Sequence, residues 1–111
     1  MNHAAQAYVI VAISYQIQER WRDSLPWLVQ AEAYATSIPE NWLAMRAAAE
    51  FQIRDFAAAE VTMKRLVERA PDKRNYWVQL AAAQQFQEKQ AQQLATLEIA
   101  HQRGLIAGSS E

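Results

Sequence analysis

Few side chains in this 111-residue chain have a spacing that could support chemistry. The two histidines, His3 and His101, have no cysteine or carboxylate at a metal-ligand spacing such as His-Glu-x-x-His. No serine is accompanied by a base that would activate it as a nucleophile. A carboxylate pair such as Glu40 and Glu50 fits a helix surface as well as general acid–base work. With only two glycines, a Gly-rich phosphate loop is absent too. We therefore expect no catalysis, no metal and no cofactor.

The composition also argues against several classes of partner. A formal net charge of −1 and a pI near 6.1 lack the basic footprint of a nucleic-acid-binding protein. No apolar run reaches the roughly 18 residues needed to span a bilayer. The absence of cysteine excludes disulfides and cysteine-based zinc sites. The first residues lack the charged and apolar regions of a secretion signal, which predicts either a cytosolic protein or a piece of a longer one.

The secondary structure is predicted to be helical, because alanine and glutamine are abundant while proline and glycine are scarce. Any binding site must therefore be formed by helices. Pro39 and Pro71 are expected to separate helices, with Asp72 or Asn75 capping the helix after Pro71. Gly104 is expected to end the last helix. The predicted helices cover residues 4–18, 24–36, 41–53, 56–69, 75–87 and 91–102.

Within these helices, Pro26 is expected in a first turn, where proline is tolerated. The helix that precedes Pro39 is expected to run long. Spacing predicts an apolar face on each of two later helices. The residues of these two faces are Val61, Leu66 and Val67 on one helix and Leu94, Leu97 and Ile99 on the other.

The sequence repeats itself with a period of about 35 residues, which is typical of arrays of helical hairpins. One period separates Trp42 from Trp77, and one period separates Ile10 from Met45. In the second half of the repeat the offset is one residue shorter, as between Met63 and Leu97. Three helical hairpins are therefore predicted, covering residues 4–38, 39–71 and 72–106.

These landmarks resemble the tetratricopeptide repeat, whose pattern is Trp-x2-Leu-Gly-x2-Tyr, then Ala-x3-Phe, then Pro. Trp42 and Trp77 take the place of the pattern's tryptophan, Ala59 that of its central alanine and Pro71 that of its proline. The sequence departs from the pattern where no glycine occurs in the first helices and where Gln93 replaces an alanine. The resemblance implies an all-α solenoid over residues 1–111, with both tryptophans in the core.

A narrower resemblance is carried by residues 71–80 and 93–106, which are similar to repeats of periplasmic proteins found alongside TonB-type energy-transduction systems. That likeness implies a fragment of a longer periplasmic protein. Without it, a cytoplasmic location is expected.

In such a solenoid the first helix of each hairpin lines a concave groove. The resemblance implies that an extended segment or an amphipathic helix of a protein partner binds there. The groove lacks a cluster of lysines and arginines, which disfavours an acidic tail as ligand. Tyr8 and Tyr15 could serve either as groove contacts or in packing between repeats. The alternative function for the protein is a self-assembling or architectural spacer without a peptide ligand. The implied groove positions are Ala5, Tyr8, Ala12, Tyr15, Glu40, Leu43, Ala47, Glu50, Asn75, Val78, Ala82 and Gln85.

Self-association is a further expectation, because a repeat stack needs a polar outer face on its last repeat. Residues 104–111 are too few to form a solvating helix. The flank formed by Leu94, Leu97, Leu105 and Ile106 is therefore expected to be partly exposed and to be covered in a homodimer.

Overall fold

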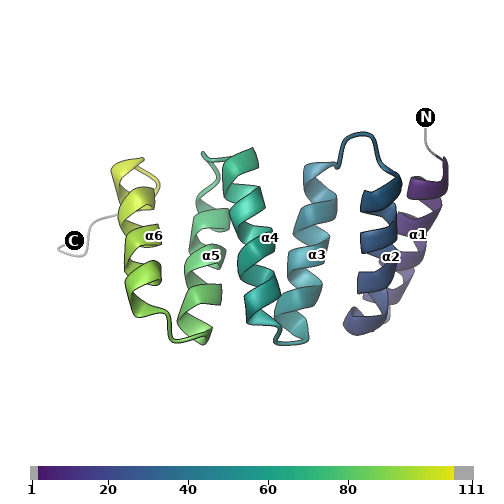
Figure 1. The fold of residues 1–111 in the computed structure, drawn as a ribbon, viewed down its shortest axis with the longest axis horizontal. Helices are drawn as coiled ribbons and strands as arrows, with labels where there is room; N and C mark the ends of the chain where they lie inside the picture. Colours follow the sequence, from purple (N-terminus) through teal and green to yellow (C-terminus); the bar gives the residue numbers. More distant parts are fainter. Residues whose placement is uncertain (1–2, 107–111) are drawn as a thin grey trace. The chain divides into compact units, whose positions relative to one another are not determined.

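The computed structural model describes residues 3–106 (Figure 1). The prediction for residues 104–111 therefore lies outside the described residues from residue 107 onwards. Within residues 3–106 every regular element is an α-helix, and the helices lie close to their predicted bounds. This confirms the all-helical prediction. The helices are α1 (His3–Ile17), α2 (Trp21–Tyr34), α3 (Glu40–Gln52), α4 (Phe56–Arg69), α5 (Arg74–Phe86) and α6 (Gln90–Gln102).

The chain divides into two compact units, Met1–Asp55 and Phe56–Glu111. In the first unit α2 packs against both α1 and α3. In the second unit α5 packs against both α4 and α6. The predicted repeat 39–71 is thereby divided, because α3 belongs to the first unit and α4 to the second.

The three turns that follow α1, α3 and α5 share one backbone conformation. Glu19, Arg54 and Glu88 each adopt a left-handed conformation, with φ values of 58°, 64° and 60°. In each turn the N–H of the next residue donates to a carbonyl of the preceding helix end, the pattern of a Schellman motif. One sequence period separates each left-handed residue from the next, so the backbone conformation repeats together with the sequence.

The end of α6 uses the same motif with glycine. Gly104 has a φ of 77°, and its N–H donates to the carbonyl of His101 at 2.9 Å. The N–H of Leu105 donates to the carbonyl of Ala100 at 3.0 Å. Gly104 therefore ends the helix as predicted, because glycine adopts the left-handed conformation without a Cβ clash.

Two expectations for α2 are wrong. The helix begins at Trp21, so Pro26 lies in its second turn, where the missing N–H deprives the carbonyl of Arg22 of its usual helical donor. The helix is also not long, since its length equals that of α4. The additional residues form the non-helical connection 35–39, which bends at residues 36 and 37. Proline at position 39 biases the residue before it away from helix.

The expected cap of α5 is also wrong. Lys73 occupies the N-cap position and makes no side-chain capping bond, so neither Asp72 nor Asn75 caps the helix. Asp72 precedes the cap position, and its carboxylate lies 3.7 Å from the guanidinium of Arg103.

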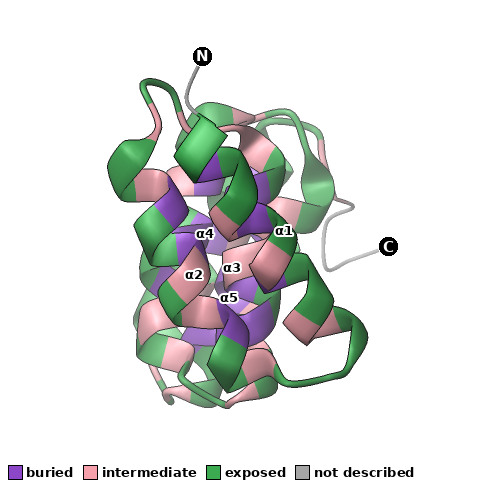
Figure 2. Ribbon diagram, turned by 90° about the vertical axis from the view of Figure 1, so that its right-hand side faces the viewer, coloured by how far each residue is buried: buried purple, intermediate pink, exposed green. Residues whose placement is uncertain are grey.

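Both landmark tryptophans are core residues, as predicted. Trp42 is 6% exposed and joins a cluster with Ala5, Val9 and Ala31 in the first unit. Trp77 is 8% exposed, and its indole N–H donates to the carbonyl of Pro71 at 2.9 Å. Figure 2 shows buried and exposed positions on the same helices, as expected of amphipathic segments.

The predicted apolar faces of α4 and α6 need correction. Val61 is 62% exposed although Leu66 is fully buried, because the spacing between them carries the two side chains to different faces of the helix. On α6, Leu94 and Ile99 are 58% and 43% exposed, and the buried positions are Thr96 and Ala100. No helix among residues 3–106 is long and apolar enough to cross a membrane.

Candidate protein-binding site

Several of the predicted groove positions lie in the interior. Ala12, Leu43, Ala47 and Glu50 are between 0% and 3% exposed. These four side chains offer a ligand no surface in this structure. The predicted positions that retain surface are Tyr8, Tyr15 and Glu40 in the first unit and Asn75, Val78, Ala82 and Gln85 in the second.

Tyr8 and Tyr15 are half-buried and contact their own hairpin. The ring of Tyr8 lies 5.9 Å from the ring of Trp27 and 5.6 Å from that of Tyr34, both on α2. The guanidinium of Arg20 lies over the ring of Tyr15, 4.7 Å from its centroid. Packing within the first hairpin is therefore the main role that the structure gives to Tyr8.

Glu50 is part of an ion-pair cluster with Arg46 and Glu32. Nε of Arg46 donates to Glu50 at 3.1 Å, and Nη1 of Arg46 donates to Glu32 on α2 at 2.9 Å. Burial acts to lower the pKa of Arg46, but the two carboxylates outweigh it, and the pKa is raised. The cluster therefore holds α2 and α3 together as charged partners.

A second buried polar network, which the sequence did not predict, joins all three helices of the second unit. Glu60 on α4 is 4% exposed and accepts hydrogen bonds from Lys89 at 2.9 Å, Gln87 at 2.9 Å and Gln84 at 3.2 Å. Gln84 in turn accepts from the hydroxyl of Thr96 on α6 at 2.7 Å.

The charge of Glu60 is stabilised by these donors. Burial alone would raise the pKa of Glu60, but hydrogen bonds from Lys89, Gln87, Gln84 and Lys64 together lower it from 4.5 to about 2. Every donor is a protein side chain, so this network serves helix packing. In the sequence, only the placement of Glu60 and Lys64 on one face of a helix hinted at it.

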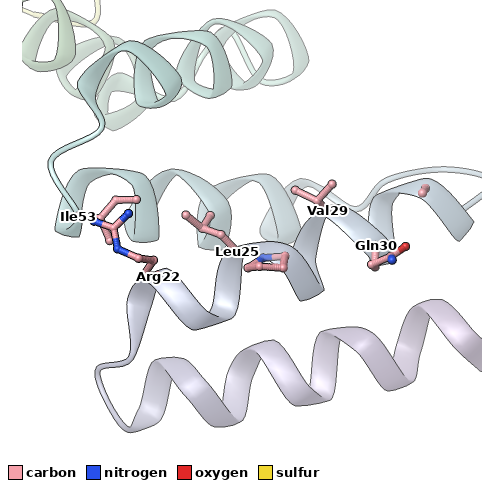
Figure 3. A pocket seen from close by; sticks show the side chains of 7 residues that line it. Arg22, Leu25, Val29, Gln30 and Ile53 are labelled. Carbon is pink, nitrogen blue, oxygen red and sulfur yellow. The ribbon is translucent and has the colours of Figure 1, made fainter.

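An apolar hollow of about 650 Å³ lies along α2 in the first unit (Figure 3). In Figure 3, Leu25 and Val29 project from successive turns of α2, and Arg22 lies beside Ile53 at one end. Sequence reasoning missed this hollow, although steps of three and four residues place its α2 members on one helix face. The lining residues are Arg22, Leu25, Pro26, Val29, Gln30, Ala33 and Ile53.

Among residues 3–106, Arg22 is the only charged residue that lines the hollow. Its neighbour Arg20 is paired with Asp23 at 2.9 Å, whereas no carboxylate among the described residues forms an ion pair with Arg22. Within residues 3–106, no three acidic, histidine or cysteine side chains are grouped so that they could hold a metal ion. The hollow therefore combines an apolar wall with one cation at its end.

Comparisons with protein-family models, curated proteins and solved structures give no match for this chain. The class that the structure itself defines is an all-helical protein with repeating turn geometry.

Proposed function

We propose that this chain is a protein-interaction module of tetratricopeptide type that binds an amphipathic helix of a partner in the hollow along α2. The observation that carries the proposal is the hollow itself, an open concave surface whose lining is mainly apolar. Ligand sites on proteins are typically concave and apolar, with a few polar groups that fix orientation. The tetratricopeptide assignment is supported by the left-handed turn residues at Glu19, Arg54 and Glu88, which recur with the sequence period.

A helix suits this hollow better than an extended segment. The wall along α2 is made of side chains, and an extended ligand would bury backbone N–H groups that find few acceptors there. A helical ligand satisfies its own backbone and presents apolar side chains at steps of three and four residues. From Arg22 to Ala33 the wall is about 16 Å long at about 1.5 Å per residue, which corresponds to about three helical turns.

Charge defines the orientation of the ligand. The guanidinium of Arg22 lies at the Ile53 end of the hollow without an ion pair among the described residues. A carboxylate on the ligand would meet it there, whereas a lysine or arginine would be repelled. We therefore propose a ligand helix with an acidic residue at the end that lies near Ile53.

The test uses two pools of synthetic helical peptides with the same variable apolar face. One pool carries a glutamate at one end of that face, and the other carries a lysine at the same position. Binding to the full chain is measured by fluorescence anisotropy. We expect the acidic pool to contain the tighter binders, by about twofold to fivefold, because a single exposed ion pair contributes at most about 1 kcal/mol.

Matched variants locate the binding surface. Val29→Glu places a charge in the hollow and should abolish binding, whereas Val61→Glu changes an exposed helical valine on α4 and should not. Equal binding by both variants would place the ligand elsewhere on the chain. No binding by either pool would favour a spacer that has no helical ligand.

A further inference from the structure

An uncovered apolar stripe runs along α1. Ile10, Ile13 and Ile17 are 62%, 40% and 77% exposed, and their spacing places them on one side of the helix. The stripe lies on a helix without a single aspartate, glutamate, lysine or arginine. Exposed apolar patches mark interaction sites, and the cores of protein interfaces are depleted of charge.

The residues that replace Ile10 in the later repeats are covered. Met45 lies one period further on and packs against a buried cluster that includes Ala5, Val9 and Ala31 of the first hairpin. Leu80 lies one period beyond Met45 and is 4% exposed on α5, which packs against α4. In the second repeat this register position therefore packs towards the hairpin before it, and in the third repeat it is buried.

The residue that replaces Ile17 in the third repeat makes the same kind of contact. Gln87 lies two periods after Ile17, and its amide donates to Glu60 at 2.9 Å and to the carbonyl of Phe56 at 3.1 Å. Both acceptors belong to α4, the helix before α5. The stripe on α1 thus occupies the repeat positions that, in later repeats, pack against the preceding hairpin.

The complementary surface is on α6. Leu94 is the counterpart of Glu60 one period later, and Glu60 is 4% exposed because side chains at the end of α5 cover it. Leu94 is 58% exposed, and Leu97 beside it is half-buried. Glu98 is the only Asp, Glu, Lys or Arg in α6. The exposed face of α6 therefore occupies the repeat position that, on α4, is covered by the following helix.

We propose that a second copy of the chain covers these surfaces, with the α1 stripe of one copy docked on the Leu94–Leu97 face of α6 in the next. The contact would continue between copies the hairpin packing that each chain already contains. It joins two different surfaces, so it is a heterologous interface that leaves one face of each kind free for further copies. The proposal is independent of the peptide site, because no residue that lines the hollow belongs to either face.

Sedimentation equilibrium of the full chain tests the proposal, with concentration raised from micromolar to millimolar. The average mass of the wild-type chain should rise beyond that of a dimer. Ile17→Glu on α1 and Leu94→Glu on α6 should each remain monomeric, and Val61→Glu should behave as wild type. Because both substituted residues are more than half exposed, the helical circular dichroism of each variant should be unchanged.

Mixing the two variants distinguishes this contact from a symmetric one. The Leu94→Glu copy keeps its α1 stripe and the Ile17→Glu copy keeps its α6 face, so an equimolar mixture should form a dimer and nothing larger. The proposal is overturned if the wild-type mass stays monomeric throughout, if either variant alone associates like wild type, or if the mixture stays monomeric.

Discussion

The buried carboxylate of Glu60 makes a quantitative prediction about stability against pH. Its pKa is lowered from 4.5 to about 2 in the folded chain. A carboxyl with a depressed pKa contributes stability that is present above its unfolded pKa and lost as the pH falls through the folded one. The loss should therefore occur between about pH 5 and pH 2.

The size of the effect follows from the lowering of the pKa of Glu60 from 4.5 to about 2. At about 1.36 kcal/mol per unit, the ceiling is about 3 kcal/mol. The side chains of Lys89 and Lys64 are 42% and 57% exposed, so water and salt weaken their contribution. We expect about 2 kcal/mol at physiological salt, since exposed ion pairs are worth little.

The perturbation is Glu60→Gln, and the assay is urea unfolding followed by circular dichroism at several pH values. Wild type should be more stable by about 2 kcal/mol near pH 7. The difference should shrink as the pH falls towards about 2, where the Glu60 carboxyl is half protonated, and vanish below it, where both side chains are neutral. Glu68→Gln, which changes an exposed carboxylate on the same helix, should follow the wild-type curve. If Glu60→Gln loses stability on acidification as steeply as wild type does, the reasoning about this network is refuted.

Three further changes should alter the free energy of unfolding, measured by the same urea method. Glu88→Gly should raise it by about 0.5–1 kcal/mol, because glycine relieves the left-handed strain at φ 60°; a loss would contradict the turn geometry. Pro26→Ala should raise the free energy of unfolding by up to about 3 kcal/mol, because it restores an N–H donor for the carbonyl of Arg22. No gain would mean that α2 already accommodates the proline. Thr96→Val should lower it by about 1–3 kcal/mol, since Gln84 loses a buried 2.7 Å hydrogen bond, and an unchanged value would mean that the bond is dispensable.

The helices were predicted well from the sequence because the composition and the positions of the prolines indicated the same helix boundaries. Alanine-rich runs favoured helix, and Pro39 and Pro71 separated the helices where the chain turns. The sequence period was also sufficient to predict equivalent turns. It could not show that a glutamate or an arginine would adopt the left-handed conformation, which glycine usually occupies.

The candidate site was much harder to predict, because burial depends on packing between helices. Leu43 and Glu50 occupy groove positions of the repeat pattern, yet both are at most 3% exposed. The hollow along α2 depends on where that helix begins, and Pro26 suggested a start later than Trp21. Three statements stay predictions from the sequence: the relationship to the tetratricopeptide repeat, the periplasmic location and the single-domain organisation.

The most direct test of the proposed function is a nuclear magnetic resonance titration of the 15N-labelled chain with the tightest peptide from the acidic pool. We predict saturable amide shifts concentrated in residues 22–33 and at Ile53, with the Val29→Glu chain showing none. Shifts concentrated instead around Tyr8, Tyr15, Val78 and Gln85 would contradict the α2 site and return the ligand to the face predicted from the repeat pattern.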